Sequence, residues 1–175
     1  MIKVHDKEFV PYLSKEQIDD KVRDIAGRIN HDYKNKKPLF IAVLNGVFMF
    51  ASDLFKELTV DAEICFIKLS SYEGVSSTGK IKTIIGIDAD ISNRDIVIIE
   101  DIVDTGKTMH ELITDLHKHK PSTLRITALL YKTQALENGI KIDYEGYLAC
   151  DKFLVGYGLD YNGLGRNLRE IYELK

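Results

Sequence analysis

The chain has 175 residues, of which 45% are hydrophobic and 29% charged, a balance typical of one soluble globular domain and not of a disordered or membrane-embedded chain. The 27 acidic and 24 basic residues give a net charge of -3, which offers no basic surface and makes nucleic acid an unexpected partner. Neither the start, Met1–Asp6, nor any later run has the apolar length of a signal peptide or membrane span, so we expect a cytoplasmic protein without a membrane partner.

The N-terminal part of the chain predicts a helix, a buried strand and a second helix. Ser14 and Gln17 have capping-box spacing, and the apolar residues after them recur at helical intervals. Residues 39–44, Leu-Phe-Ile-Ala-Val-Leu, form a short apolar run that predicts a buried strand. Asn45-Gly46 then predicts a turn, and residues 47–58 a helix.

Two further strands are predicted on either side of a polar loop. Residues 62–69 and 82–87 have strand-like apolar content. Residues 70–80, Ser-Ser-Tyr-Glu-Gly-Val-Ser-Ser-Thr-Gly-Lys, are polar and contain glycine. Loops of this length are usually functional or mobile, although a surface loop with no role fits the same sequence.

The remaining chain alternates strands with a helix. Strands are predicted over 96–99, 124–130 and 144–149, and a helix from Lys107 or Thr108 that Pro121 terminates. This alternation predicts an α/β fold with a mostly parallel central sheet flanked by helices. No repeat or linker separates a second domain, so residues 1–175 are expected to form a single domain.

Ligands of such sheets bind beyond the carboxyl ends of the strands. Asn45, Asp104 and Lys132 each fall just beyond a predicted strand end. The functional site is therefore expected at this edge of the sheet.

The turn after the strand that starts at Ile96 is suited to a single phosphate. In the motif G-x-x-x-x-G-K-[ST] the first glycine would stand at Asp101, and its absence argues against a nucleoside triphosphate. Backbone amides at Thr105-Gly106 and at the following helix start point at one anion, and the hydroxyls of Thr105 and Thr108 add donors. These features predict a site for one phosphate monoester.

Three carboxylates lie beside this predicted phosphate site: Glu100, Asp101 and Asp104. They repel phosphate, so they need hydroxyl or cationic partners, which the hydroxyls of a ribose and a magnesium ion supply. A sugar 5-phosphate satisfies both requirements. The alternative is a helix capped by Asp104, but a cap needs one acid and this turn carries three.

The sequence from Val97 to Met109 resembles the phosphoribosyl pyrophosphate (PRPP) signature of type I phosphoribosyltransferases. Further segments are similar to the 6-oxopurine branch, the hypoxanthine-guanine phosphoribosyltransferases, and the resemblance runs from about Leu39 to Arg166. These segments are Leu44-Asn45-Gly46, Ser71-Tyr72, Lys132 and Asp151–Asn162. The resemblance implies that a small hood formed by the chain ends accompanies the central sheet.

The resemblance also implies the reaction and the partners. Hypoxanthine or guanine and PRPP would give IMP or GMP and pyrophosphate, with Mg²⁺ as cofactor, in a homodimer or homotetramer. Asp104 would act as the general base for the purine's proton, a role typically worth about 10²–10⁴-fold in rate. Lys132 would donate to the 6-oxo group, which adenine lacks, whereas without the resemblance a surface lysine at a strand end would be the favoured interpretation.

The remaining residues of the implied site fall into groups by the part of the reaction they serve. Glu100 and Asp101 would hold the ribose hydroxyls, and the 5-phosphate would be held by Asp104, Thr105, Gly106, Lys107 and Thr108. The base would stack on Phe153 and meet a carbonyl near Leu154. Pyrophosphate would be bound by Asn45, Gly46 and Arg166. Magnesium would be held near Glu100, Asp101 and Asp160, and residues 70–80 would form a mobile lid through Ser71 and Tyr72.

One position departs from the family. Mammalian relatives carry lysine where this chain has Asn45, so a cationic contact with pyrophosphate from that position is absent. Three other functions stay open. They are a sibling transferase that prefers xanthine, a PRPP-sensing regulator that binds RNA with this fold, and a sugar-phosphate-binding module without turnover.

Overall fold

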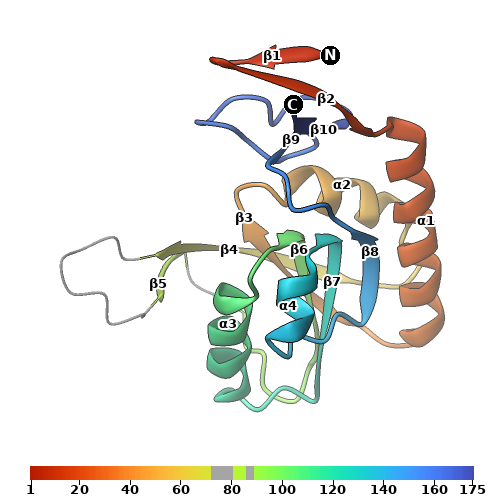
Figure 1. Cartoon of the computed structure of the whole chain (residues 1–175). Coiled ribbons are helices and arrows are strands. Elements are labelled where there is room, and N and C mark those ends of the chain that lie inside the picture. The colour runs from red at the N-terminus through yellow and green to blue at the C-terminus, as the bar shows by residue number, and fades with distance from the viewer. Residues whose placement is uncertain (72–80, 86–88) are drawn as a thin grey trace.

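We describe the chain from a computed structural model, which covers residues 1–71, 81–85 and 89–175. In these residues a central sheet has the strand order β5-β4-β3-β6-β7-β8 (Figure 1). Its strands are β3 (Leu39–Leu44), β4 (Glu63–Ser71), β5 (Ile81–Ile85), β6 (Asp95–Val103), β7 (Thr123–Tyr131) and β8 (Tyr144–Leu148). All neighbours pair in parallel except β4 and β5, which are antiparallel, so the predicted mostly parallel sheet is confirmed.

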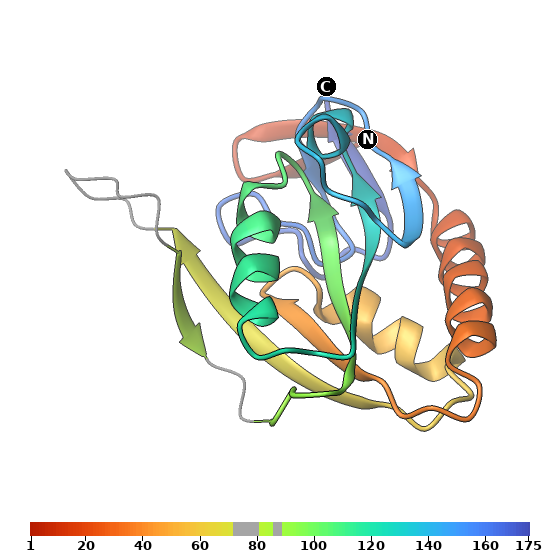
Figure 2. The same ribbon diagram turned by 90° about the horizontal axis from the view of Figure 1, so that it is seen from below.

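Helices cover both faces of this sheet (Figure 2). They are α1 (Lys15–Asp32), α2 (Phe48–Glu57), α3 (Lys107–His117) and α4 (Thr133–Glu137). Because successive strand residues face opposite sides, Val97 and Ile99 of β6 pack with α1 and α2, whereas Ile96 and Ile98 pack with α3 and α4. The apolar runs read from the sequence therefore fill two cores, one on each side of the sheet.

The start of α1 follows the predicted capping box. The Ser14 hydroxyl accepts a hydrogen bond from the Gln17 amide, and the Gln17 side chain accepts one from the Ser14 amide at 2.9 Å. Five buried residues then form the inward stripe of the helix: Ile18, Val22, Ile25, Ala26 and Ile29. This stripe fixes α1 against the sheet.

Both ends of the chain join a second, antiparallel sheet of order β1-β2-β10-β9, the hood. Its strands are β1 (Ile2–Val4), β2 (Lys7–Leu13), β9 (Leu154–Val155) and β10 (Ile171–Leu174). The two termini lie close together in Figures 1 and 2, and the Lys175 amide donates to the Glu8 carbonyl at 3.1 Å. The Tyr157 hydroxyl donates to Asp53 of α2 at 2.7 Å and ties the hood to the main body. The expected hood of chain ends is confirmed.

Some predicted boundaries shift. The strand expected over 96–99 continues to Val103, and the strand expected over 62–69 continues to Ser71, which pairs with Ile81. Apart from Ser70 and Ser71, the lid expected over 70–80, including Tyr72, lies outside the described residues and stays a prediction. Among the helices of the covered ranges, none is long and apolar enough to cross a membrane.

Candidate active site

The parallel strands β3, β6 and β7 end at one edge of the sheet, below the hood. Beyond these ends lie Asn45-Gly46, the turn Asp104–Thr108, and Lys132. The Lys132 amide donates to the Val103 carbonyl at 3.0 Å, which ties the ends of β6 and β7 together. The expected gathering of these segments is confirmed, and two cavities open between them.

The first cavity, here called the turn cavity, lies on the α3 side of the sheet. It is lined by Val43, Leu69, Glu100, Ile102, Val103, Asp104, Thr105, Gly106, Thr108, Met109 and Leu112. Gly106 is the N-cap of α3 with a left-handed φ of 77°, and no side chain caps the helix. The alternative in which Asp104 is the helix cap is therefore wrong. The amides of the first turn have no carbonyl partner within the helix, so those of Thr108 and Met109 are available to an anion in this cavity.

Lys107 and Thr105 contribute to this turn in different ways. The Lys107 side chain is exposed and does not line the turn cavity, while its amide donates to the Thr105 hydroxyl at 3.4 Å. The Thr105 carbonyl accepts a hydrogen bond from the Asn138 side chain at 2.8 Å. The end of α4 thus supports the turn through the hydrogen bond from Asn138.

The second cavity, here called the hood cavity, lies between the sheet edge and the hood. It is lined by Gly46, Asp101, Ile102, Asp104, Lys132, Lys152, Phe153, Leu154, Leu159, Asp160 and Arg166. Ile102 and Asp104 line both cavities, so the two spaces meet at Asp104. The Lys132 ammonium lies 3.1 Å from the Asp104 carboxylate, which places a cation and a proton acceptor side by side.

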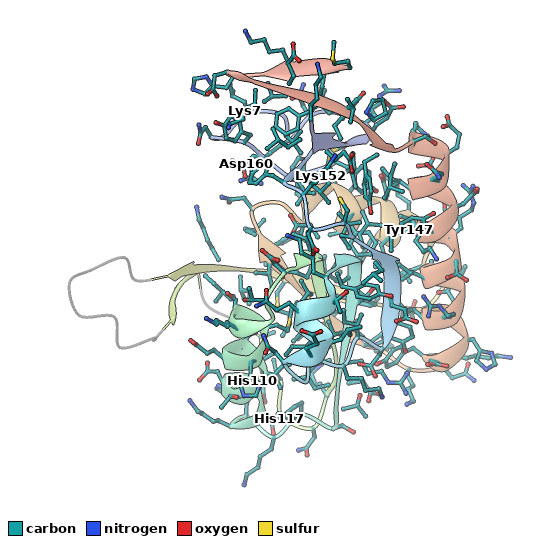
Figure 3. All side chains as sticks on the ribbon, in the orientation of Figure 1. Lys7, His110, His117, Tyr147, Lys152 and Asp160 are labelled. Atoms are coloured by element: carbon teal, nitrogen blue, oxygen red, sulfur yellow. The ribbon has the colours of Figure 1, made fainter. Side chains whose placement is uncertain are left out.

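Aromatic and apolar groups form the hood side of this cavity. Phe153 is 48% exposed, and its ring meets that of Tyr161 edge-on with centroids 5.7 Å apart. Leu154 is buried in β9 directly after it. Figure 3 shows Asp160 and Lys152 at the hood, far from His110 and His117 on α3. Phe153 is thus the exposed apolar surface that a flat ring can cover.

Arg166 and two glycines shape the opposite wall. The Arg166 guanidinium pairs with Asp160 at 2.6 Å and donates to the Gly158 carbonyl at 2.7 Å. A Cβ on Gly46 would lie 1.7 Å from an Asp101 oxygen, and one on Gly158 would lie 1.9 Å from the Gly46 carbonyl, so neither position accepts a side chain. Asn45, joined to Leu44 by a cis peptide, is exposed and does not line either cavity. Arg166 and Asp160, for which separate roles were expected, are brought together here.

Two neighbouring acids of β6 lie in surroundings that disfavour their charged forms: Asp101 is buried, and Glu100 is half-buried. Glu100 lines the turn cavity and Asp101 the hood cavity, and the Glu100 Oε2 atom is buried with no hydrogen-bond partner. Burial, reinforced by the charge of Asp101, raises the pKa of Glu100 well above its usual range. Burial also raises the pKa of Asp101 to about 6, although the Ile102 amide and Arg166 oppose this shift. Both carboxylates would be stabilised by hydroxyl donors or a cation.

The oxygen donors suit magnesium. Asp101 and Asp160 line the same cavity, and carboxylate oxygens together with substrate phosphates are the usual ligands of Mg²⁺. Glu100 lines the other cavity, and within the covered ranges no three acidic, histidine or cysteine side chains are grouped closely enough to hold a metal alone. The protein side of such a site would therefore be incomplete until a phosphate-bearing ligand added its oxygens.

Several lining residues were not expected from the sequence. Ile102 separates the two cavities, and Lys152 reaches the hood cavity while pairing with Glu173 at 2.7 Å. Both flank predicted site residues, so adjacency was the one signal that pointed to them. Asn138 carried no such signal, because it is an exposed polar residue 33 positions from the turn it supports.

Comparisons with known proteins agree with this geometry. Residues 12–162 match the phosphoribosyl transferase domain. The chain is 40% identical over 152 residues to a hypoxanthine phosphoribosyltransferase of Buchnera aphidicola, covering 85% of this chain and 86% of that protein. It is 38% identical over 172 residues to the hypoxanthine-guanine phosphoribosyltransferase of Bacillus subtilis, covering 98% and 95%. The crystal structure of a hypoxanthine-guanine phosphoribosyltransferase from Bacillus anthracis superposes with a TM-score of 0.89 at 36% identity, covering 97% and 98% of the two chains.

Proposed function

Because this chain belongs to the phosphoribosyltransferase family and is an enzyme of its hypoxanthine-guanine branch, we propose that it transfers the phosphoribosyl group of PRPP to hypoxanthine or guanine. The products are IMP or GMP and pyrophosphate. The observation that carries the proposal is the meeting of the turn cavity and the hood cavity at Asp104. A sugar phosphate in one and a purine in the other bring C1 and the attacking ring nitrogen together at that residue.

The 5-phosphate of PRPP is assigned to the turn cavity. Amides of the α3 first turn and the hydroxyls of Thr105 and Thr108 donate to its oxygens. Glu100 and Asp101 lie one on each side of β6 and accept from the ribose hydroxyls. The pKa of each acid is raised because burial disfavours its ionised form. A ribose hydroxyl that donates to the carboxylate would stabilise the ionised form, which supports this role.

The purine is assigned to the hood cavity, where it replaces the ion pair between Lys132 and Asp104. Lys132 then donates to the 6-oxo group, and Asp104 accepts the proton of the ring nitrogen as the C1–N bond forms and the C1–O bond to pyrophosphate breaks. Phe153 stacks on the ring, and the Leu154 carbonyl accepts from the amino group of guanine. Adenine would place an amino donor against the ammonium of Lys132 and is rejected.

Pyrophosphate is assigned to the hood-cavity wall formed by Gly46 and Arg166, while Asn45, expected in the same role, lies outside this wall. The planar guanidinium of Arg166 matches phosphate oxygens and already lies beside Asp160. Asp101 and Asp160 would hold magnesium, which would neutralise the charge that develops on the leaving group, and Glu100 lies on the other side of the strand.

One assay tests the proposal. Pyrophosphate release is measured with PRPP and each of hypoxanthine, guanine, xanthine and adenine. We expect turnover with hypoxanthine and guanine and none with adenine. Preference for xanthine would indicate the sibling transferase, and PRPP binding without release from any base would indicate a module that only binds the sugar phosphate.

A regulator that binds RNA is the remaining alternative. It needs a basic face, which a net charge of -3 does not support. It would also have no use for a lysine that distinguishes purines. Association with RNA in the absence of turnover would favour it over the transferase.

A further inference from the structure

The turn that holds the phosphate in the proposed function contains a peptide group with little intrinsic preference for one orientation. Gly106 has a left-handed φ of 77°, and glycine tolerates both positive and negative φ. The Thr105–Gly106 peptide can therefore rotate at low cost unless another group fixes it. Its orientation matters because a trans peptide carries its C=O and N–H on opposite sides.

A side chain from α4 fixes one of the two orientations. The Asn138 amide group donates to the Thr105 carbonyl at 2.8 Å. The turn cavity lies on the other side of the turn, where its walls include Val43 of β3 and Leu69 of β4, whereas α4 follows β7 (Figure 1). With the carbonyl turned to α4, the Gly106 N–H is turned to the cavity.

The end of α4 is built to hold Asn138 in place. The Ile140 amide donates to the Ala135 carbonyl at 3.1 Å, and the Gly139 amide donates to the Leu136 carbonyl at 2.9 Å. This pair of bonds, with Gly139 at a φ of 82°, is a Schellman motif that fixes the backbone on both sides of Asn138. The same motif brings Ile140 beneath Gly106, where a Cβ would lie 2.6 Å from its Cγ1 atom.

From this geometry we propose that Asn138 is a positioning residue for the 5-phosphate site. It keeps the Thr105 carbonyl away from the turn cavity and presents the Gly106 amide to the phosphate. In the flipped orientation the carbonyl oxygen would face the phosphate and repel it. The inference rests on the proposed function only in taking the turn cavity as the phosphate site.

The test uses ligands that occupy different parts of the site. Wild type, Asn138→Ala and Asn138→Asp are titrated with ribose 5-phosphate and, separately, with magnesium pyrophosphate. Glu137→Ala is the matched control, because Glu137 is the exposed neighbour of Asn138 on the same short helix. Binding is followed by calorimetry and by the NMR signal of the Gly106 amide, and thermal unfolding monitors the fold of each variant.

The loss of one hydrogen bond donor should raise the ribose 5-phosphate Kd and the KM for PRPP about three- to tenfold in Asn138→Ala. Asn138→Asp should lose more, because it removes the donor and also places a negatively charged oxygen against the Thr105 carbonyl, which it repels. In both Asn138 variants, the affinity for pyrophosphate and the KM for hypoxanthine should stay close to the wild-type values. The Glu137→Ala variant should match wild type in all of these quantities. The Gly106 amide signal should shift less on ribose 5-phosphate addition in both Asn138 variants.

Unchanged ribose 5-phosphate affinity in both Asn138 variants would overturn the inference. Equal losses for ribose 5-phosphate and pyrophosphate would also overturn it, because they indicate general damage to the fold. A wild-type protein that binds ribose 5-phosphate but releases no pyrophosphate from PRPP with any of the purines would refute the proposed function and leave this inference intact. A wild-type protein that binds no ribose 5-phosphate yet releases pyrophosphate from PRPP would overturn this inference and leave the transferase activity intact.

Discussion

The pKa values of acidic residues at the two ends of the central sheet are shifted in opposite directions. At the amino ends of β7 and β8, Asp32 pairs with Arg125 and accepts from the Tyr144 hydroxyl at 2.9 Å, and these bonds lower its pKa. At the carboxyl end of β6, burial raises the pKa of Asp101 to about 6 and leaves an oxygen of Glu100 unpartnered. Asp32 has its countercharge within the chain, whereas Glu100 and Asp101 would be stabilised by the hydroxyls or cation of a ligand. Burying these site acids therefore lowers the stability of the folded protein, and interactions in the rest of the fold must compensate for the loss.

Removal of divalent cations should have the largest effect, because it withdraws the countercharge that the site acids lack. Under excess chelator, with metal removal verified, turnover with PRPP and hypoxanthine should be lost. The thermal midpoint of the ligand-free protein should not change, since Asp32 and its partners need no metal. Full activity without metal would contradict the role assigned to Asp101 and Asp160.

Asp104→Asn should slow the chemical step by on the order of 10²-fold or more, because an amide keeps the shape of the side chain but cannot take the purine's proton. PRPP affinity should change little, since the α3 amides still hold the phosphate. Single-turnover rates and a PRPP titration measure the two effects separately. A lost PRPP affinity with unimpaired chemistry would recast Asp104 as a binding residue.

Lys132→Ala should lower kcat/KM for hypoxanthine by about 10-fold to 100-fold, as expected for a hydrogen bond from a charged donor. The same variant should bind PRPP nearly as tightly as wild type, because Lys132 is assigned to the 6-oxo group of the purine and to no part of PRPP. Steady-state kinetics with both substrates varied separates these quantities. Lys141→Ala, a change at an 86% exposed lysine side chain outside both cavities, serves as the control.

Asp101→Asn should remove the loss of stability that the buried Asp101 carboxylate causes at the carboxyl end of β6. Its folded pKa of about 6 lies above the usual 3.8, so the folded protein holds this proton more tightly and wild-type stability falls as pH rises from about 4 to about 6. The neutral amide avoids this loss and still accepts from the Ile102 amide. The variant should gain about 2–3 kcal/mol in free energy of unfolding near neutral pH and almost nothing at about pH 4.

Urea unfolding of wild type and Asp101→Asn over this pH range measures the gain. The variant should be more stable and less active, which is the signature of a site acid. A variant that loses stability near neutral pH would mean that Asp101 is a structural acid like Asp32.

Asp32→Asn should show the opposite pattern with the smallest magnitude. Because its folded pKa is lowered, the stabilisation by Arg125 and Tyr144 is present above about pH 4 and is lost as pH falls through the folded pKa. The pair is partly exposed, so solvent screening limits the expected loss to about 1 kcal/mol near neutral pH. Turnover should equal that of wild type, and a drop in kcat would show that the two ends of the sheet are coupled.

Local sequence predicted the fold where one short run of residues decides the structure. The strand Leu39–Leu44 was predicted with its true ends, because six apolar residues lie between Pro38 and the Asn45-Gly46 turn. Strand β6 runs past the apolar run since its pairing with β7 continues through Glu100 and Ile102, a contact that hydrophobicity does not reveal. The helix α4 has five residues and too few turns for a periodic pattern.

The site was predictable to the extent that it follows from topology. Asp104 and Lys132 were placed at the same sheet edge because parallel strands end together, and the resemblance to known transferases supplied the hood. The pairing of Asp160 with Arg166 depends on how the hood loop folds back on itself. The support of Thr105 by Asn138 depends on a contact between loops of two different strands. Neither contact has a local sequence pattern.

The pairing of β2 with β10 has a consequence for the synthesis of the protein. On the ribosome, residues 7–13 emerge long before their partner strand at 171–174. The hood sheet therefore cannot be completed until translation of its last strand has ended, whereas the central sheet has all its strands by residue 148. Since β9 and the hood loop carry Phe153, Asp160 and Arg166, a nascent or prematurely terminated chain retains the phosphate turn but lacks a finished purine pocket. The purine side of the proposed site can therefore form only after residues 171–174 have been made.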